Sequence, residues 1–192
     1  MKTIKIAIAF ALLTAAMAIT SCTSNTNTVS KAEADSVRNQ LSQLTAGNEI
    51  IAKNLAKFDT LDYVVFSNEE WTRLHESHAQ DIIVHWPDGH FTTGIDKHIE
   101  DLKFMFVYAP DTEIKVHQIE IGSGNMTAVM GIMTGTFTKP MPIGNGKFIQ
   151  PTGKSFKLPM ATIGIWKVDG TMSEEYLFWD NQTYMNQIGL RK

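Results

Sequence analysis

Cysteine is almost absent from this sequence: Cys22 is the only one among 192 residues. A single thiol cannot form an intramolecular disulfide, so the fold must depend on its apolar core. Basic residues are also few, with 17 lysines and arginines against 20 acidic residues and a net charge of −3. Because phosphate backbones are bound by positively charged faces, we expect no nucleic-acid partner.

Apolar runs long enough to span a bilayer are also missing. The apolar stretch at residues 6–19 is shorter than the ~20 residues that a membrane-spanning helix needs. It follows Lys2 and Lys5 and ends in small residues, which is typical of a secretory signal. The Ile-Thr-Ser-Cys ending at Cys22 resembles the lipobox of bacterial lipoproteins. The alternative is a soluble secreted protein with an unpaired cysteine.

We therefore predict three segments. Residues 1–21 are a lipoprotein signal peptide, and residues 22–47 are a polar tether followed by a helical arm that Ser30 caps and Gly47 ends. Residues 48–192 form one folded domain. Lipidation of Cys22 would anchor the protein to a membrane of the bacterial cell envelope, in the periplasm or at the outer membrane.

The periodicity of the remaining chain predicts an α+β fold, with helices first and then an antiparallel meander of four strands joined by an earlier strand. A capping box from Ser67 to Glu70 is expected to start the second of four helices in this domain. The expected helices are 49–58, 69–79, 95–107 and 182–189, and the expected strands are 81–86, 112–121, 126–138, 154–168 and 171–181.

Asp169-Gly170 predicts a two-residue hairpin turn, in which the numbers of paired residues sum to 339. One face of this hairpin then carries Tyr176, Phe178 and Asp180, and we expect it to line an interior pocket. The other face carries Trp166, Leu177 and Trp179, and it is apolar too. We expect a second subunit to cover that face in a homodimer. Alternatively, the N-terminal arm or the tail helix covers it.

Two residues are candidates for proton transfer. Asp180 ends a strand beside aromatic side chains, where poor solvation would raise the pKa of its carboxyl and make it a useful base. Its alternative role is the N-cap of the tail helix that follows. His85 lies between Val84 and Trp86 and could exchange a proton with a ligand. The alternative for His85 is a core histidine bonded to the backbone.

Motifs for metals and cofactors are not evident. His75-Glu76-Ser77-His78 is one residue short of the H-E-x-x-H spacing, and the sequence implies no third ligand. The chain has no G-x-G-x-x-G, P-loop, zinc-finger or G-x-S-x-G pattern. We therefore expect neither a metal nor a cofactor.

Five short motifs, taken in order, are similar to those of the SnoaL-like polyketide cyclase group, also called ester cyclases, within the NTF2-like superfamily. They are D-I-I-V-H-W-P-D-G at 81–89, A-P-D at 109–111, P-T-G-K at 151–154, E-E-Y-L-F-W-D-N-Q at 174–182 and Q-I-G-L at 187–190. The resemblance covers about residues 48–192. It implies a cone-shaped α+β barrel, in which N-terminal helices and a curved, mostly antiparallel sheet enclose an apolar pocket, and it implies a dimer.

The resemblance also implies a chemistry. Cyclases of this family use an aspartate as general acid and base in an intramolecular aldol condensation, and the matching position is Asp180. His85 and Trp86 match pocket-lining positions. The leading hypothesis is a cofactor-independent cyclase or isomerase acting on a small carbonyl compound through Asp180 and His85. The alternatives are a lipoprotein that binds a small apolar molecule without chemistry, and an interaction protein. The residues expected to bind the ligand are Trp71, His78, Trp86, Tyr176 and Phe178.

Overall fold

The computed structural model describes residues 29–190. This described part divides into two units, residues 29–38 and residues 39–190. The predicted signal peptide and Cys22 lie outside the described residues, as does most of the predicted polar tether. Within the described part, no helix has the length and apolar character needed to cross a membrane.

The first helix is α1 (Lys31–Thr60), and the sequence predicts its start correctly but not its end. Its start is as expected: the Ser30 hydroxyl accepts from the Glu33 N–H at 3.2 Å, and the Glu33 carboxylate accepts from the Ser30 N–H at 2.9 Å. The predicted end at Gly47 is wrong, because the helix continues to Thr60. A glycine inside a helix lowers the stability of the helix by only about 1 kcal/mol relative to alanine, and the helix-forming residues on both sides offset this loss.

Two short helical segments follow α1: the π-helix η1 (Leu61–Phe66) and the 3₁₀-helix η2 (Trp71–Glu76). The predicted capping box between Ser67 and Glu70 is wrong. The Ser67 hydroxyl instead donates to the Asp62 carbonyl at 2.6 Å and accepts from the Ile114 N–H at 2.8 Å. A tertiary contact therefore replaces the local cap, and it ties η1 to the sheet.

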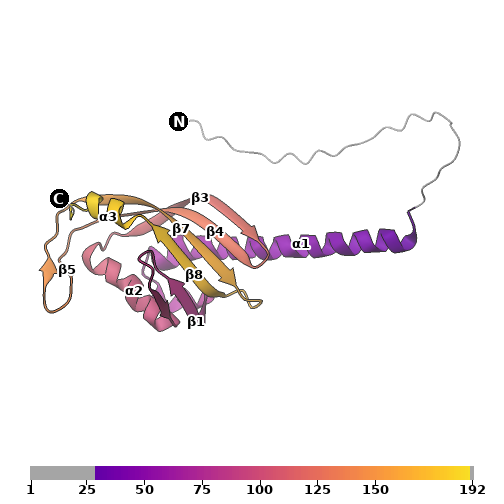
Figure 1. The fold of residues 1–192 in the computed structure, drawn as a ribbon, viewed down its shortest axis with the longest axis horizontal. Coiled ribbons are helices and arrows are strands. Elements are labelled where there is room, and N and C mark those ends of the chain that lie inside the picture. Colours follow the sequence, from indigo (N-terminus) through magenta and orange to yellow (C-terminus); the bar gives the residue numbers. More distant parts are fainter. Residues whose placement is uncertain (1–28, 191–192) are drawn as a thin grey trace, which may run out of the picture. The chain divides into compact units, whose positions relative to one another are not determined.

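The main sheet has six strands in the order β2-β1-β8-β7-β4-β3 (Figure 1). Its neighbours are antiparallel except for β1 and β8, and its two edge strands do not pair with each other, so the curved sheet is not closed. The predicted α+β class and strand arrangement are confirmed. The strands are β1 (His78–His85), β2 (Phe91–Thr93), β3 (Glu113–Ser123), β4 (Met126–Thr136), β7 (Ser155–Trp166) and β8 (Met172–Trp179).

The other elements fill the connections. Helix α2 (Ile95–Tyr108) packs against β1, and helix α3 (Asn181–Gln187) follows β8. Strands β5 (Met141–Pro142) and β6 (Phe148–Ile149) form a separate small hairpin in the loop before β7.

The β7–β8 hairpin has the predicted register, since Met160 pairs with Trp179 and Ile165 with Glu174. A one-residue shift occurs only next to the turn, where Gly170 has a φ of +78°. However, the predicted facing is reversed. Leu177 is 6 % exposed and faces the core with the helices, whereas Phe178 is 50 % exposed on the outer face.

The reversed facing also corrects the expected dimer contact. Trp166, Leu177 and Trp179 pack in or against the core of a single chain, so they do not form the face that a second subunit could cover. The Trp166 indole meets the Phe58 ring edge to face at 5.9 Å and donates to the Thr127 hydroxyl at 2.8 Å. Because the side chains of β8 are bulky and apolar on both faces, alternation alone could not tell the inner face from the outer one.

Candidate functional site

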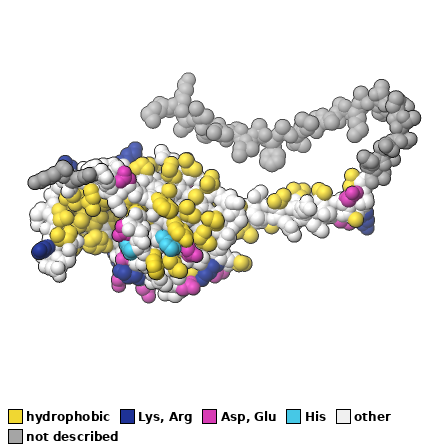
Figure 2. Space-filling view, viewed as in Figure 1, with side chains coloured by type: hydrophobic (Ala, Val, Ile, Leu, Met, Phe, Trp, Pro, Cys, Tyr) yellow, Lys and Arg dark blue, Asp and Glu magenta, His cyan; other side chains and the backbone are white. Residues whose placement is uncertain are grey.

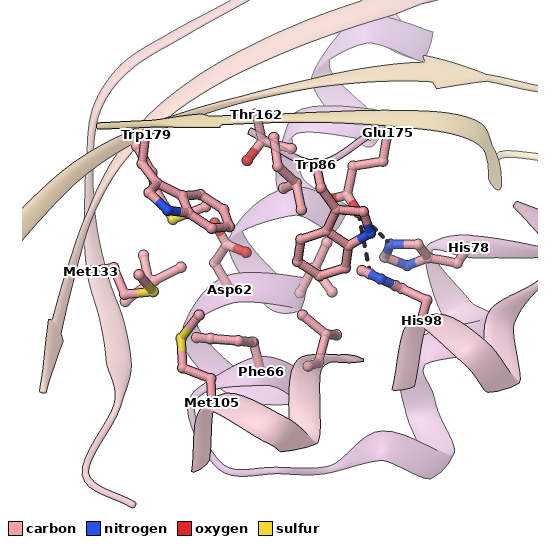
Figure 3. Close-up of a pocket in the computed structure, with 15 residues that line it drawn as sticks. Asp62, Phe66, His78, Trp86, His98, Met105, Met133, Thr162, Glu175 and Trp179 are labelled. Atoms are coloured by element: carbon pink, nitrogen blue, oxygen red, sulfur yellow. Dashed lines mark hydrogen bonds and ion pairs between the residues drawn. The ribbon is translucent and has the colours of Figure 1, made fainter. Parts of the chain in front are cut away.

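A cavity lies between the inner face of the sheet and the helices (Figure 3). The space open to the centres of water-sized molecules is about 40 Å³, which is enough for a few waters or a very small ligand. Most of the lining is apolar, and its ionisable groups are Asp62, His78, His98 and Glu175. The complete lining is Leu61, Asp62, Phe66, His78, Trp86, His98, Leu102, Met105, Ile114, Met133, Met160, Thr162, Glu175, Leu177 and Trp179.

A buried carboxylate with two imidazoles occupies one end of the cavity. The Glu175 Oε2 atom lies 3.4 Å from His78 Nε2 and 3.2 Å from His98 Nε2. These side chains come from β8, β1 and α2, and they converge on one point in Figure 3. Burial acts to raise the pKa of Glu175, but hydrogen bonds and charge interactions with both histidines hold it below its usual value. Burial also lowers the pKa of His98.

A second acid, Asp62, enters the cavity from η1. Its side chain is 13 % exposed, and His117 Nε2 lies 2.8 Å from Asp62 Oδ2. Burial raises the pKa of the Asp62 carboxyl above its usual value, and the interaction with His117 offsets only part of that rise. A carboxyl with a raised pKa in an apolar cavity is suited to accept a proton from a bound molecule and return it.

His117 on β3 is held by carboxylates at both ring nitrogens. Its Nδ1 atom lies 2.9 Å from Asp59 Oδ1 and 3.0 Å from Glu120 Oε1, while Nε2 faces Asp62. Burial alone would lower the pKa of His117, but the three carboxylates raise it to about 8. His117 is therefore largely cationic near pH 7, and it orients the Asp62 carboxyl from behind.

Two of the predicted ligand-binding residues line this cavity: His78 and Trp86. Trp71 does not, because it packs edge to face on Phe66 and Phe106 and borders a separate surface depression with His75.

The predicted catalytic histidine lies elsewhere. The ring of His85 stacks on Tyr176 at 4.0 Å on the outer side of the sheet, and Glu174 Oε2 lies 3.3 Å from His85 Nε2. The Tyr176 hydroxyl donates to the same oxygen at 2.7 Å. Neither residue lines the interior cavity, so the expectation that they do is wrong. Its cause is the reversed facing of β8, next to which β1 is paired.

Asp180 is the N-cap of α3, as the alternative interpretation had it. Its Oδ1 accepts from the Gln182 and Thr183 amides at 2.8 and 3.0 Å, and its Oδ2 accepts from the Thr183 hydroxyl at 2.9 Å. Asp180 and Phe178 border an outer depression, and they do not line the interior cavity. A catalytic role for Asp180 stays a prediction, and the interior acid that the sequence reasoning missed is Asp62.

Signals for some of the missed residues were present. Glu175 shares its strand phase with Leu177 and Trp179, and His98 lies on the apolar stripe of α2 with Ile95 and Leu102. A histidine or glutamate in an apolar phase indicates a buried polar site. No comparable pattern marks Asp62, because η1 is an irregular π-helical turn.

The family model for SnoaL-like polyketide cyclases matches residues 59–188. These residues include the cavity lining and His117. No match to a curated protein was found.

Solved structures share the fold at low identity. A provisionally assigned SnoaL-like polyketide cyclase from Jannaschia sp. CCS1 is 19 % identical with a TM-score of 0.63, covering 73 % of this chain and 94 % of that one. IdmH from Streptomyces antibioticus, also provisionally assigned as a polyketide cyclase, is 22 % identical with a TM-score of 0.58, covering 72 % and 98 %. An NTF2-like protein of unknown function from Burkholderia pseudomallei is 16 % identical with a TM-score of 0.57, covering 71 % and 98 %.

At these identities the structures establish the fold and not the activity. They confirm the predicted NTF2-like arrangement of helices against a curved, mostly antiparallel sheet, although this sheet is not closed into a barrel. Because the family model covers well over half of the chain, the protein belongs to the SnoaL-like polyketide cyclase family.

Proposed function

We propose that this domain catalyses cyclase- or isomerase-type proton transfer on a small carbonyl compound, with Asp62 as the general acid and base. The observation that carries the proposal is the position of Asp62. It is the carboxyl that lies in an apolar cavity with a pKa raised by burial, and a cationic His117 orients it. Removing a proton beside a carbonyl and returning it at another atom needs one group of this kind.

The cavity limits the substrate. With about 40 Å³ of free space, the cavity accepts a compound of a few heavy atoms, and a larger one requires its wall to move. Trp86 and Trp179 meet edge to face at 6.3 Å in that wall. Both are only partly buried, so rotation of their rings is the simplest way to enlarge the cavity.

The experiment uses acetone, which has four heavy atoms, as a probe in D₂O, with proton NMR reporting the exchange of its α-hydrogens. We expect the wild-type protein to accelerate exchange above buffer and Asp62→Asn to lose this acceleration. Asp180→Asn is the matched control, since asparagine also caps helices, and it should keep the acceleration. Equal rates with wild type and Asp62→Asn, or no acceleration by wild type, would contradict the proposal.

The second candidate is a module that binds a small apolar molecule without chemistry, and the mostly apolar lining favours it. The same probe separates the two candidates. Binding of acetone to wild type without any exchange of its α-hydrogens favours the binding module.

We also propose that Cys22 is lipidated and anchors the protein to the bacterial envelope. The support comes from the apolar stretch, its preceding lysines and the Ile-Thr-Ser-Cys ending. Cells grown with labelled palmitate should label the wild type and not Cys22→Ser. Equal labelling of both proteins, or of neither, would contradict the anchor.

Finally, we propose a homodimer formed through the outer face of the sheet. Cross-strand pairing aligns Ile121, Ile163 and Tyr176 in one row, and it aligns Ile119 and Phe178 in the next. Ile119, Ile121 and Phe178 are each at least half exposed. Figure 2 shows apolar side chains gathered over the domain on the side in view. A second copy of the same apolar face would remove it from water.

A further inference from the structure

The cluster of His78, His98 and Glu175 has the spacing of metal ligands. Its three nitrogen and oxygen atoms all lie within 4.8 Å of one another. The two contacts to Glu175, at 3.4 and 3.2 Å, are longer than the ~2.7–2.9 Å of a charge-assisted hydrogen bond. Two ligands that each lie ~2.0–2.1 Å from a tetrahedral zinc ion are separated by about 3.3–3.4 Å. We propose that these three residues bind a divalent transition-metal ion, with Zn²⁺ as the best fit.

The hydrogen bonds around His78 orient its ring for this role. The Ser77 hydroxyl lies 2.9 Å from His78 Nδ1 and 3.3 Å from the Leu74 carbonyl. When Ser77 donates to that carbonyl, it accepts from Nδ1–H, and the lone pair of Nε2 then faces the Glu175 carboxylate. A cation between the two groups makes this arrangement favourable. A partner on the second ring nitrogen is also the usual environment of a metal-binding histidine.

Burial supports the same assignment. His78 and His98 are each 2 % exposed and Glu175 is 4 % exposed, so an anionic carboxylate is held almost without water. A divalent ion would compensate the buried negative charge of Glu175 more strongly than the two histidines alone do.

Two histidines and one glutamate leave a position open on the ion. Three protein ligands and one exchangeable position are typical of catalytic zinc, whereas structural zinc has four protein ligands. The same residues line the cavity, so a water or a carbonyl oxygen there could take the fourth position. The site does not rest on the proposed chemistry of Asp62, because a metal can bind whether or not proton transfer occurs.

The test measures metal binding and not turnover. Chelator-treated protein is titrated with ZnCl₂ by calorimetry and with CoCl₂ by visible absorption, which reports four-coordinate cobalt. We expect one ion per chain, with affinity at least about 100-fold weaker in Glu175→Gln and in His98→Gln, since a lost ligand costs at least as much as a lost supporting contact. His75→Gln is the matched control. His75 lies three residues before His78 in the sequence but is not part of the cluster, so His75→Gln should bind the ion like wild type.

A second cluster, Asp59, His117 and Glu120, has similar spacing and is more exposed. Asp59→Asn therefore controls for binding there. Loss of the ion in Asp59→Asn with retention in Glu175→Gln would overturn the proposal. Failure of wild type to bind either metal between pH 6 and pH 8 would also overturn it, and the cluster would then be a hydrogen-bonded triad. Circular dichroism of each variant identifies any loss that comes from unfolding, and His98→Gln replaces Glu175→Gln if the latter does not fold.

Discussion

His117 should make the stability of the domain fall as pH rises from about 6.5 to 9. Its pKa is about 8 in the folded protein against 6.5 for an unperturbed histidine, because Asp62, Asp59 and Glu120 surround its ring. In this interval the folded protein holds a proton that the unfolded chain has released. The resulting stabilisation is complete below the unfolded pKa, and it is lost as pH rises through the folded pKa.

The size of the effect follows from the two pKa values. Their difference of about 1.5 corresponds to about 2 kcal/mol, at 1.36 kcal/mol for each pKa unit. Solvent screens part of this, because the Asp59 side chain is 42 % exposed and the Glu120 side chain is 32 % exposed. We therefore expect a loss of roughly 1–2 kcal/mol in the free energy of unfolding between pH 6 and pH 9.

Urea denaturation followed by tryptophan fluorescence at several pH values measures this loss. His117→Gln should be less stable than wild type at pH 6 and should lack the fall assigned to residue 117. The exposed His90, replaced in His90→Gln, should leave the fall unchanged. A wild-type stability that is constant or rising over this interval would refute the argument, as would an equal fall in His117→Gln.

Three further predictions concern the cap, the facing of β8 and the dimer. Asp180→Ala should cost about 1 kcal/mol of stability through loss of the α3 cap, measured by urea denaturation, and an unchanged midpoint would contradict the cap. Leu177→Ala should cost about 2–5 kcal/mol, whereas Phe178→Ala in the monomeric state should cost less than about 1 kcal/mol; the reverse order would contradict the observed facing. Residues 29–192 should sediment as a dimer at micromolar concentration and Phe178→Glu as a monomer, and a monomeric wild type would contradict the outer-face interface.

The order of elements in the domain was accessible from the sequence because it depends on local signals. Strands 126–138 and 154–168 were expected within two residues of β4 and β7, and Asp169-Gly170 fixed the pairing of Met160 with Trp179. The predictions at Gly47 and Ser67 failed because the surrounding structure can override a local signal. Both are local signals, and a continuous helix overrides the first while a contact with β3 overrides the second.

The site was harder to predict, because it depends on which face of the sheet the helices cover. Tyr176 and Phe178 are as apolar as Leu177 and Trp179, so the alternation is ambiguous. Glu175 could have resolved the ambiguity if a buried carboxylate paired with histidines had been considered. The pairing of Asp62 with His117 joins residues 55 apart in the chain, and nothing local announces it.

The pKa of the Asp62 carboxyl is the measurement that tests the central claim most directly. Carboxyl-carbon NMR over a pH titration of chelator-treated protein can follow this group, with Asp62→Asn identifying its signal. The account predicts a pKa above 3.8, because burial in the cavity disfavours the charged form more than His117 favours it. A value at or below 3.8 would show that Asp62 is a simple ion-pair partner of His117, and it would contradict its role as the acid and base of the site.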